Sequence, residues 1–365
     1  MPIGVAIIGS GIFVKEHHLP AVQLTPHLTL KAIYSRSLKS AQELGAQVDL
    51  YSDDSGAGKT YHDLLLDDSI AAVIIALPIL NQPEYIEAAL AAGKHVLSEK
   101  PIAKDLKRAH HLIEYSKSDK VKGGATWSVA ENYRYLGSFV YARQEVQKLG
   151  RILGFTIKSF GNVTASDKYY SEDYKTRRGV NILDIKEVSF SMVFTRRSGP
   201  LTTQHLGVHF VAGARLLLGE EAKPVALTAY STLLREQLPP VDTINSIWLT
   251  KSGISGTFSV SFGTSLFGNE YTIACEKGSV SLMGSKVTVR EGEEKDGKSS
   301  TVDFKERGQG NGVEQEDAAW GEALTKGHTL PNQSPEEALA DLEIIEKILR
   351  SGEAQGKSET LQFQV

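Results

Sequence analysis

The stretch Ile3-Gly4-Val5-Ala6-Ile7-Ile8-Gly9-Ser10-Gly11 decides the fold of the first part of this chain. An almost entirely apolar run that ends at a glycine is typical of a strand buried on both faces of a parallel sheet. A helical pattern follows the Gly-x-Gly turn as far as about Leu24, so backbone N–H groups at a helix start can face a pyrophosphate. The stretch therefore predicts a strand, a turn and a helix that bind a nucleotide.

The turn departs from the usual glycine fingerprint at one position. Gly9 permits the tight turn and Gly11 lets a phosphate approach the backbone, but Val14 stands where a third glycine is usual. The third glycine serves helix–strand packing and not phosphate contact, so the predicted nucleotide site remains. The alternative interpretation is an ordinary turn.

Strands and helices alternate along the first third of the chain. After the first strand, we expect strands at Leu28–Tyr34, Ala71–Leu77 and His95–Ser98, with a helix at Pro83–Ala92. Such alternation predicts a doubly wound parallel sheet with right-handed crossovers, which is the Rossmann type of α/β fold. We place this domain at residues 1–124.

Beyond about Gly124 the pattern changes. A long helix is expected at Glu131–Leu149, a strand at Arg151–Asn162 and a helix around His205–Leu218. Strand-like runs with short turns follow at Val225–Leu233, Thr243–Thr250, Ile254–Phe262, Tyr271–Glu276, Ser279–Leu282 and Lys286–Arg290. Residues 125–365 are therefore predicted to form an α+β domain with a large, mainly antiparallel open sheet. The charged, glycine-rich residues 291–312 are expected to form a solvated hairpin and loop.

Composition narrows the classes of function. A formal net charge of -4 over 365 residues gives no overall electrostatic attraction to nucleic acid or an anionic membrane. No apolar run approaches the roughly 20 residues of a membrane span. Cys275 is the one cysteine, which excludes an internal disulfide and fits a reducing compartment. Since the N-terminus enters a strand pattern without the apolar core of a signal peptide, we expect a cytoplasmic protein with no nucleic-acid or membrane partner.

The residues after the second expected strand predict which nicotinamide cofactor binds. NAD sites usually place an Asp or Glu there, whereas an arginine can accommodate the 2′-phosphate of NADP. This chain has Ser35 and Arg36 at that position, with Lys39 nearby and no acid. The pattern favours NADP over NAD. Arg36 as a solvated residue at a helix start is the alternative.

Further along, the sequence resembles a known family. The segment Ala91-Ala92-Gly93-Lys94-His95-Val96-Leu97-Ser98-Glu99-Lys100-Pro101, preceded by Ala76-Leu77-Pro78 and Asn81, is similar to the glucose–fructose oxidoreductase/inositol dehydrogenase (Gfo/Idh/MocA) family, above all to its fungal members. The resemblance implies hydride transfer between NAD(P) and a sugar, polyol or related carbonyl. It also implies a homo-oligomer, such as a dimer, because the open sheet of the second domain commonly forms the subunit contact in that family.

The resemblance also assigns residues to the site. It implies pyrophosphate contacts from Gly9, Ser10, Gly11, Ile12 and Phe13, adenosine-ribose contacts from Ser35, Arg36 and Lys39, and nicotinamide contacts from Leu77, Asn81, Glu99 and Lys100. Asn132 and Arg134 match the Asn-x-Arg segment of the substrate cleft, and His209 matches a catalytic or substrate-binding histidine. His205 occupies the family's aspartate position in that cleft.

Chemistry supports a catalytic role for Lys100. Hydride transfer to a carbonyl leaves an oxyanion, which an adjacent ammonium stabilises and can protonate. We therefore predict an enzyme in which Lys100 is the acid/base and His209 assists. A surface lysine at a strand end is the alternative for Lys100.

Departures from the family pattern leave a second interpretation open. His205 replaces an aspartate that usually partners the lysine, and residues 179–197 match nothing in the family. That segment is either a lineage-specific insertion or an error in the gene model. A catalytically impaired NAD(P)-binding regulator or sensor is thus the rival function. His205 and His209 have the spacing of metal ligands, but no third ligand is evident, so we predict no metal. The pair His17 and His18 is expected to be structural, and substrate identity stays open.

Overall fold

The computed structural model describes residues 1–162, 203–236, 238, 241–292, 297–306 and 310–365, with the side chains of 203–206 excepted. The chain forms two compact units. The first unit is Met1–Tyr135 with Arg307–Leu339, and the second is Leu136–Glu306 with Ala340–Val365. Residues 307–339 thus join the N-terminal part of the chain, whereas the division into 1–124 and 125–365 stays a prediction about domains.

The first unit contains a six-stranded parallel sheet in the order β3-β2-β1-β4-β5-β6. Its strands are β1 (Ile3–Ile8), β2 (Leu28–Ser35), β3 (Asp49–Ser52), β4 (Ala72–Ile75), β5 (His95–Ser98) and β6 (Trp127–Val129). This order, in which β1 lies beside β4, is that of the Rossmann fold. The predicted fold of this part is confirmed.

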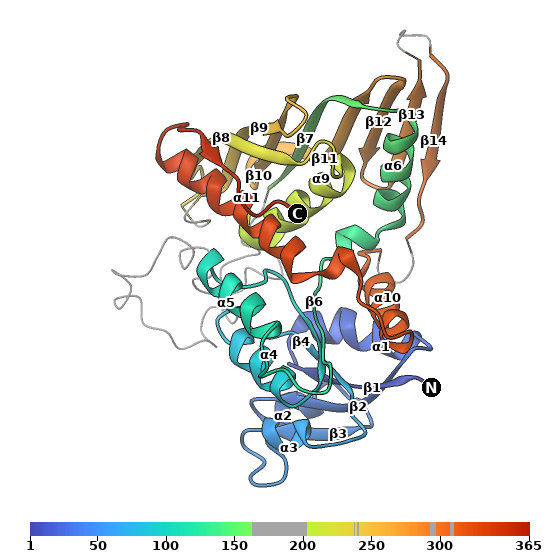
Figure 1. Ribbon diagram of the computed structural model, residues 1–365, viewed down its shortest axis with the longest axis vertical. Helices are drawn as coiled ribbons and strands as arrows, with labels where there is room; N and C mark the ends of the chain where they lie inside the picture. Colours follow the sequence, from blue (N-terminus) through green and yellow to red (C-terminus); the bar gives the residue numbers. More distant parts are fainter. Residues whose placement is uncertain (163–202, 237, 239–240, 293–296, 307–309) are drawn as a thin grey trace. The chain divides into compact units, whose positions relative to one another are not determined.

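Helices cover both faces of this sheet. They are the π-helical turn η1 (Val14–His18), α1 (Leu19–Leu24), α2 (Leu38–Gln42), α3 (Tyr61–Leu65), α4 (Gln82–Ala91), α5 (Leu106–Ser116) and α10 (Val313–Thr325), with 3-10 turns at η2 (Asn132–Tyr135) and η4 (Pro331–Gln333). In Figure 1, α4 and α5 lie on one side of the sheet, and α1 and α10 on the other. Because helices cover both faces, every side chain from Val5 to Ile8 of β1 is fully buried. This burial explains why the strand consists of apolar residues.

Helix α10 completes the core of the first unit. Its Trp320 is buried in one cluster with Val5 of β1 and Val22 of α1. Gly321 lets the helix approach closely, since a Cβ there would lie 2.7 Å from Cγ of Leu28. Residues about 300 positions apart in the sequence therefore share one hydrophobic core.

The second unit is built on a nine-stranded sheet in the order β14-β13-β12-β11-β7-β10-β9-β8-β15. Its strands are β7 (Ile152–Asn162), β8 (Pro224–Thr232), β9 (Thr243–Thr250), β10 (Ser255–Ser261), β11 (Gly263–Cys275), β12 (Gly278–Met283), β13 (Lys286–Glu291), β14 (Ser299–Asp303) and β15 (Glu359–Thr360). Among the described strands of this sheet, only β10 and β7 pair in parallel. The mainly antiparallel sheet is confirmed.

Helices α6 (Gly137–Lys148) and α9 (Thr203–Leu218) pack on this sheet, and α11 (Pro335–Glu353) spans the boundary between the units. Strand β9 alternates strictly between the two faces of the sheet. Ile244 and Trp248 are buried, while Ile247 and Leu249 are exposed. One face of the sheet thus supplies the core, and the other presents apolar side chains.

One local expectation was wrong, and two short strands were missed. The helix expected from Glu131 begins only at Gly137, because Leu136 is extended and the Glu306 carboxylate accepts hydrogen bonds from the N–H groups of Gly137 and Ser138. Strands β3 and β6 were missed because they are only 4 and 3 residues long. The solvated hairpin expected within residues 291–312 is confirmed, because the exposed strand β14 pairs antiparallel with β13. Within the described chain, no helix has the length and apolar character needed to cross a bilayer.

Candidate functional site

The glycine turn lies at the end of the central strand β1. Gly9 has φ +129°, and a Cβ there would lie 2.4 Å from the carbonyl oxygen of Ala76. Its N–H donates to the carbonyl of Tyr34 at 2.8 Å, so the turn is held against β2 and β4. Gly11 is different, because a Cβ there would meet nothing within 4 Å. Gly9 is therefore required by the fold, whereas the open side of Gly11 leaves room for a phosphate.

Ser10, Ile12 and Phe13 lie in and directly after the glycine turn, and Ser10 contacts the end of β2. The hydroxyl oxygens of Ser10 and Ser35 are 2.7 Å apart, which links the glycine turn to the end of β2. The side chain of Ile12 is 42% exposed, and the ring of Phe13 contacts that of His17. The five residues from Gly9 to Phe13 thus lie together at the carboxyl end of β1.

Two exposed cations follow β2. Arg36 and Lys39 are exposed, and neither forms an ion pair with any residue that the structure describes. An acid that the pattern after β2 does not reveal, Asp54, lies nearby. Asp54 accepts hydrogen bonds from the N–H of Leu38 at 2.7 Å and from the hydroxyl of Ser52 at 2.6 Å. The bonds from Ser52 and Leu38 lower the pKa of Asp54. This residue follows β3, so no pattern at the end of β2 could have revealed it.

Strands β4 and β5 bring the other predicted cofactor residues to the same edge. Leu77 lies just after β4, and its Cδ2 is 3.6 Å from the position of a Cβ on Gly9. Asn81 precedes α4 and is exposed. The N–H of Glu99 donates to the carbonyl of Ile75 at 2.9 Å, so Glu99 and Lys100 leave the sheet beside β4. In open α/β sheets, ligands bind outside the carboxyl ends of neighbouring strands, and these residues lie at such a place.

Lys100 is half-buried at this edge, and the peptide bond to Pro101 is cis. The Glu99 side chain is 13% exposed and turns toward the interior. Its Oε1 lies 2.9 Å from Nε2 of His18, whose Nδ1 lies 3.1 Å from Oδ2 of Asp317. His18 and Asp317 are fully buried. The expectation that His18 is structural did not include these charged partners, because Asp317 is far away in the sequence.

The ionisable groups in this cluster influence one another. Burial alone would lower the pKa of His18, but the charges and hydrogen bonds of Asp317 and Glu99 raise it well above 6.5. Burial raises the pKa of Asp317, which His18 opposes. Burial, reinforced by the charges of Asp317 and Glu99, raises the pKa of the adjacent Glu316 well above 4.5. Glu316 accepts a hydrogen bond from the N–H of Glu131.

The predicted substrate residues Asn132 and Arg134 lie in η2 and are both buried. The amide of Asn132 donates to the carbonyl of Asn311. The Arg134 guanidinium donates to the carbonyl of Asn332 at 3.2 Å and forms an ion pair with Glu337 at 3.3 Å. Both side chains thus form their polar contacts with residues 310–339, the C-terminal stretch of the first unit.

The remaining predicted residues belong to the second unit. His209 lies in α9 and is 8% exposed, between the buried Val208 and Phe210. The backbone of His205 lies in the same helix, and residues 179–197 lie outside the described residues. Searched over the described residues, the structure holds no group of three or more His, Cys, Asp or Glu side chains arranged for a metal ion.

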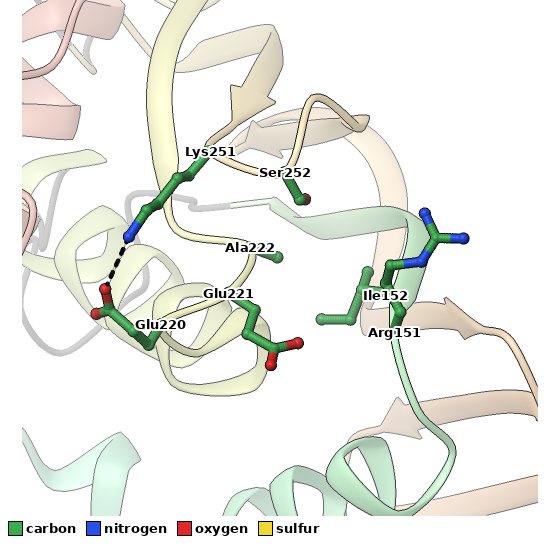
Figure 2. A pocket seen from close by; sticks show the side chains of 7 residues that line it. All are labelled: Arg151, Ile152, Glu220, Glu221, Ala222, Lys251 and Ser252. Carbon is green, nitrogen blue, oxygen red and sulfur yellow. Dashed lines mark hydrogen bonds and ion pairs between the residues drawn. The ribbon is translucent and has the colours of Figure 1, made fainter.

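A separate cavity of about 410 Å³ opens in the second unit (Figure 2). Its lining consists of Arg151, Ile152, Glu220, Glu221, Ala222, Lys251 and Ser252. Lys251 and Glu220 form an ion pair of 3.4 Å across one side of it. None of the predicted site residues lines this cavity, so we assign it no part in the reaction.

Two family models match the chain. A model of an oxidoreductase family with an NAD-binding Rossmann fold matches residues 3–124, and one of an oxidoreductase family C-terminal alpha/beta domain matches residues 194–360. The chain is 36% identical to dehydrogenase FPY6 of Fusarium mangiferae over 372 aligned residues, which cover 99% of this chain and 100% of the relative.

A second relative and a solved structure are also oxidoreductases. A scyllo-inositol 2-dehydrogenase (NADP(+)) of Bacillus subtilis, IolU, is 27% identical over 59% of this chain and 58% of its own length. The crystal structure of an oxidoreductase from Thermotoga maritima superposes with a TM-score of 0.78 and 24% identity, covering 99% of this chain and 98% of its own. This last comparison shows a shared fold.

Proposed function

The chain belongs to the Gfo/Idh/MocA family of oxidoreductases, and we propose that it transfers a hydride between NADP and a carbonyl or alcohol group of a sugar, polyol or small aldehyde. At the coarser level, the chain is an NAD(P)-dependent dehydrogenase or reductase that acts on CH–OH or C=O groups. One observation carries the proposal. The glycine turn, Leu77 and Lys100 follow three neighbouring parallel strands and meet at one edge of the sheet.

The residues at this edge fit a dinucleotide. The open side of Gly11 admits a pyrophosphate, which the N–H groups of residues 10–13 would bind. Ser35, Arg36 and Lys39 would hold the adenosine ribose, while Leu77, Asn81, Glu99 and Lys100 would border the nicotinamide. When bound, the cofactor supplies or accepts the hydride.

Lys100 and His209 are assigned to proton transfer. We infer that the Lys100 ammonium donates a proton to the oxyanion formed when a carbonyl is reduced, and that the amine accepts it in the reverse direction. His209 would orient the substrate oxygen. Asn132, Arg134 and His205 remain our candidates for the substrate cleft. The engaged side chains of Asn132 and Arg134 support a role in shaping that cleft.

The assay that tests this proposal follows the loss of NADPH absorbance with a panel of sugars, inososes and small aldehydes. Turnover of at least one substrate is the expected result. Tight NADPH binding without turnover of any substrate would overturn the proposed reaction and would favour the non-catalytic sensor.

We expect Arg36→Ala to weaken NADPH binding by about 10- to 100-fold and NADH binding by less than about 3-fold. An exposed guanidinium is a strong partner for the 2′-phosphate, and a charged hydrogen bond contributes about 1.5–3 kcal/mol. The name of the relative from Bacillus subtilis, which specifies NADP(+), supports this preference. Fluorescence titration of both cofactors measures the two Kd values.

The matched control is Arg290→Ala, which removes an exposed arginine from β13 of the second unit. It should leave both Kd values unchanged. If the unmodified protein bound NADH more tightly than NADPH, the NADP assignment would be wrong, and Asp54 would become the candidate partner of the ribose hydroxyls.

We propose a dimer that forms through the exposed face of the nine-stranded sheet. Tyr230 of β8 lies opposite Asn245, which places it on the same face as Ile247 and Leu249. These three side chains are 64%, 52% and 44% exposed. Apolar side chains gathered on one face are typical of an interface core.

Ile247→Lys is therefore expected to convert the dimer to a monomer, because a buried lysine would lack a partner in the interface. Size-exclusion chromatography with light scattering measures the mass. Leu66→Lys is the control, since Leu66 is 78% exposed in the first unit. A monomeric unmodified protein, or a variant that stays dimeric, would contradict the proposal.

We also propose a cytoplasmic location, for which Cys275 is the support. The thiol is buried, and burial raises its pKa to about 11. A single unreactive cysteine suits a reducing compartment.

A further inference from the structure

The His18 imidazole lies between two carboxylates inside the first unit. Nε2 is 2.9 Å from Oε1 of Glu99, and Nδ1 is 3.1 Å from Oδ2 of Asp317. A neutral imidazole can donate at one nitrogen only, whereas an imidazolium donates at both. Carboxylate oxygens on opposite sides of the ring, each at hydrogen-bond distance from a ring nitrogen, therefore favour the charged form. The shift of the His18 pKa well above 6.5 agrees with this geometry.

The charges of His18 and Asp317 depend on each other because both side chains are shielded from water. His18 and Asp317 are fully buried, and Oδ1 of Asp317 accepts no hydrogen bond from any described residue. Removing His18 would leave that carboxylate buried without its cationic partner, which is costly in a protein interior. Three further groups lie at the cluster. They are Glu316 of α10, whose raised pKa favours the neutral acid, Glu131, and the ring of Phe13, 5.4 Å from the His18 ring.

The cluster joins three elements that meet at the candidate site. His18 ends the π-helical turn that follows the phosphate-binding glycines, Asp317 lies in α10, and Glu99 directly precedes Lys100 at the end of β5. Packing of α10 on the sheet does not need these charges, because Trp320, Val22 and Val5 already supply an apolar contact. Buried ion pairs often contribute less to stability than apolar residues of similar size would. A role in placing Glu99 therefore explains the cluster better than a role in stability.

We propose that His18 is a positioning residue for the reaction: as an imidazolium held by Asp317, it fixes the Glu99 carboxylate and with it the backbone that presents Lys100. This inference rests on the proposed function, since it concerns the placement of the group that transfers the proton. A misplacement of about 1 Å at a reacting centre can lower the rate about 100-fold. The bond from the N–H of Glu99 to Ile75 fixes one side of this backbone, and His18 fixes the other through the Glu99 side chain.

The test compares His18→Gln and Asp317→Asn with the matched control Glu316→Gln. Glu316 is the neighbour of Asp317 in the same helix and is equally buried, but it contacts the N–H of Glu131 and not His18. Each full-length variant is first checked for its thermal midpoint and for its Kd for NADPH. The kcat is then measured at saturating NADPH with a substrate found in the panel described above.

We expect His18→Gln and Asp317→Asn to lower kcat by about 10- to 100-fold, with a Kd for NADPH within about 3-fold of the unmodified protein. Glu316→Gln should keep kcat within about 2-fold. Equal losses in all three variants would indicate a purely structural role and overturn the inference. An unchanged kcat in His18→Gln would overturn it as well.

A second measurement does not need a substrate. The side chains of all 10 histidines can be labelled with ¹⁵N, and the signal missing from the His18→Gln spectrum identifies His18. Two protonated ring nitrogens at pH 7.5 are expected, and a neutral ring would overturn the inference. An unmodified protein that turns over no substrate would count against the proposed function alone, and the ¹⁵N spectrum would then decide the inference.

Discussion

Lys100→Ala is expected to lower kcat/KM by about 1,000-fold while the protein still folds and binds NADPH. The side chain is half-buried at the end of β5, where we propose that it borders the nicotinamide. Loss of a general acid typically costs a factor of about 100 to 10,000, and loss of a cation next to an oxyanion adds to it. Steady-state kinetics with NADPH and a substrate from the panel measure the effect, and fluorescence titration gives the Kd for NADPH.

Two further variants separate charge from proton transfer. Lys100→Arg keeps a cation whose proton is not released at neutral pH, so it should restore little of the activity. Lys107→Ala removes an exposed lysine from α5 and should behave like the unmodified protein. Equal turnover by Lys100→Ala and the unmodified protein would remove Lys100 from the mechanism.

The second large effect is a contrast between two glycines of one turn. Gly9→Ala should destabilise the folded state by about 2–4 kcal/mol, because φ +129° excludes most other residues and the new Cβ would lie 2.4 Å from the Ala76 carbonyl oxygen. Gly11→Ala should leave the free energy of unfolding within about 1 kcal/mol, since its φ is not in the left-handed region and its Cβ would meet nothing within 4 Å. Urea unfolding measures both changes.

For NADPH binding by the folded protein, we expect Gly11→Ala to have the larger effect of the two substitutions. In the folded fraction, the methyl group of Gly11→Ala would occupy the side on which a phosphate approaches, and we expect the Kd for NADPH to rise about 10- to 100-fold. A stable Gly11→Ala variant with an unchanged Kd would show that the pyrophosphate binds elsewhere.

Local patterns predicted the central elements well. The bounds of β1 and β5 agree with the expected strands, because each is a short apolar run that ends at a glycine or a polar residue. The serine at position 37 caps α2, a local signal of the kind that sequence reveals, with its side chain accepting from the N–H of Ser40. Sequence alone was sufficient where one element and its ends determine the structure.

Contacts between distant segments could not be predicted. Asp317 meets His18 across 299 positions, and Glu316 meets Glu131 across 185. Nothing in a short window indicates that an acidic pair in α10 will be buried beside the glycine turn. The same limit applies to Asp54, which approaches Leu38 from the loop after another strand. Paired charges are recognised only once the fold has brought them together.

The return of α10 to the first unit also has a consequence for biosynthesis. The strands of the Rossmann sheet have all been synthesised once the chain reaches residue 129, but Trp320 of their core is added about 190 residues later. At roughly 5–20 residues per second, that interval lasts about 10–40 s. During this time Val5 and Val22 lack the indole that covers them, and His18 lacks Asp317. The first unit therefore cannot complete its core until α10 has been translated. The nascent chain needs protection from aggregation over that period.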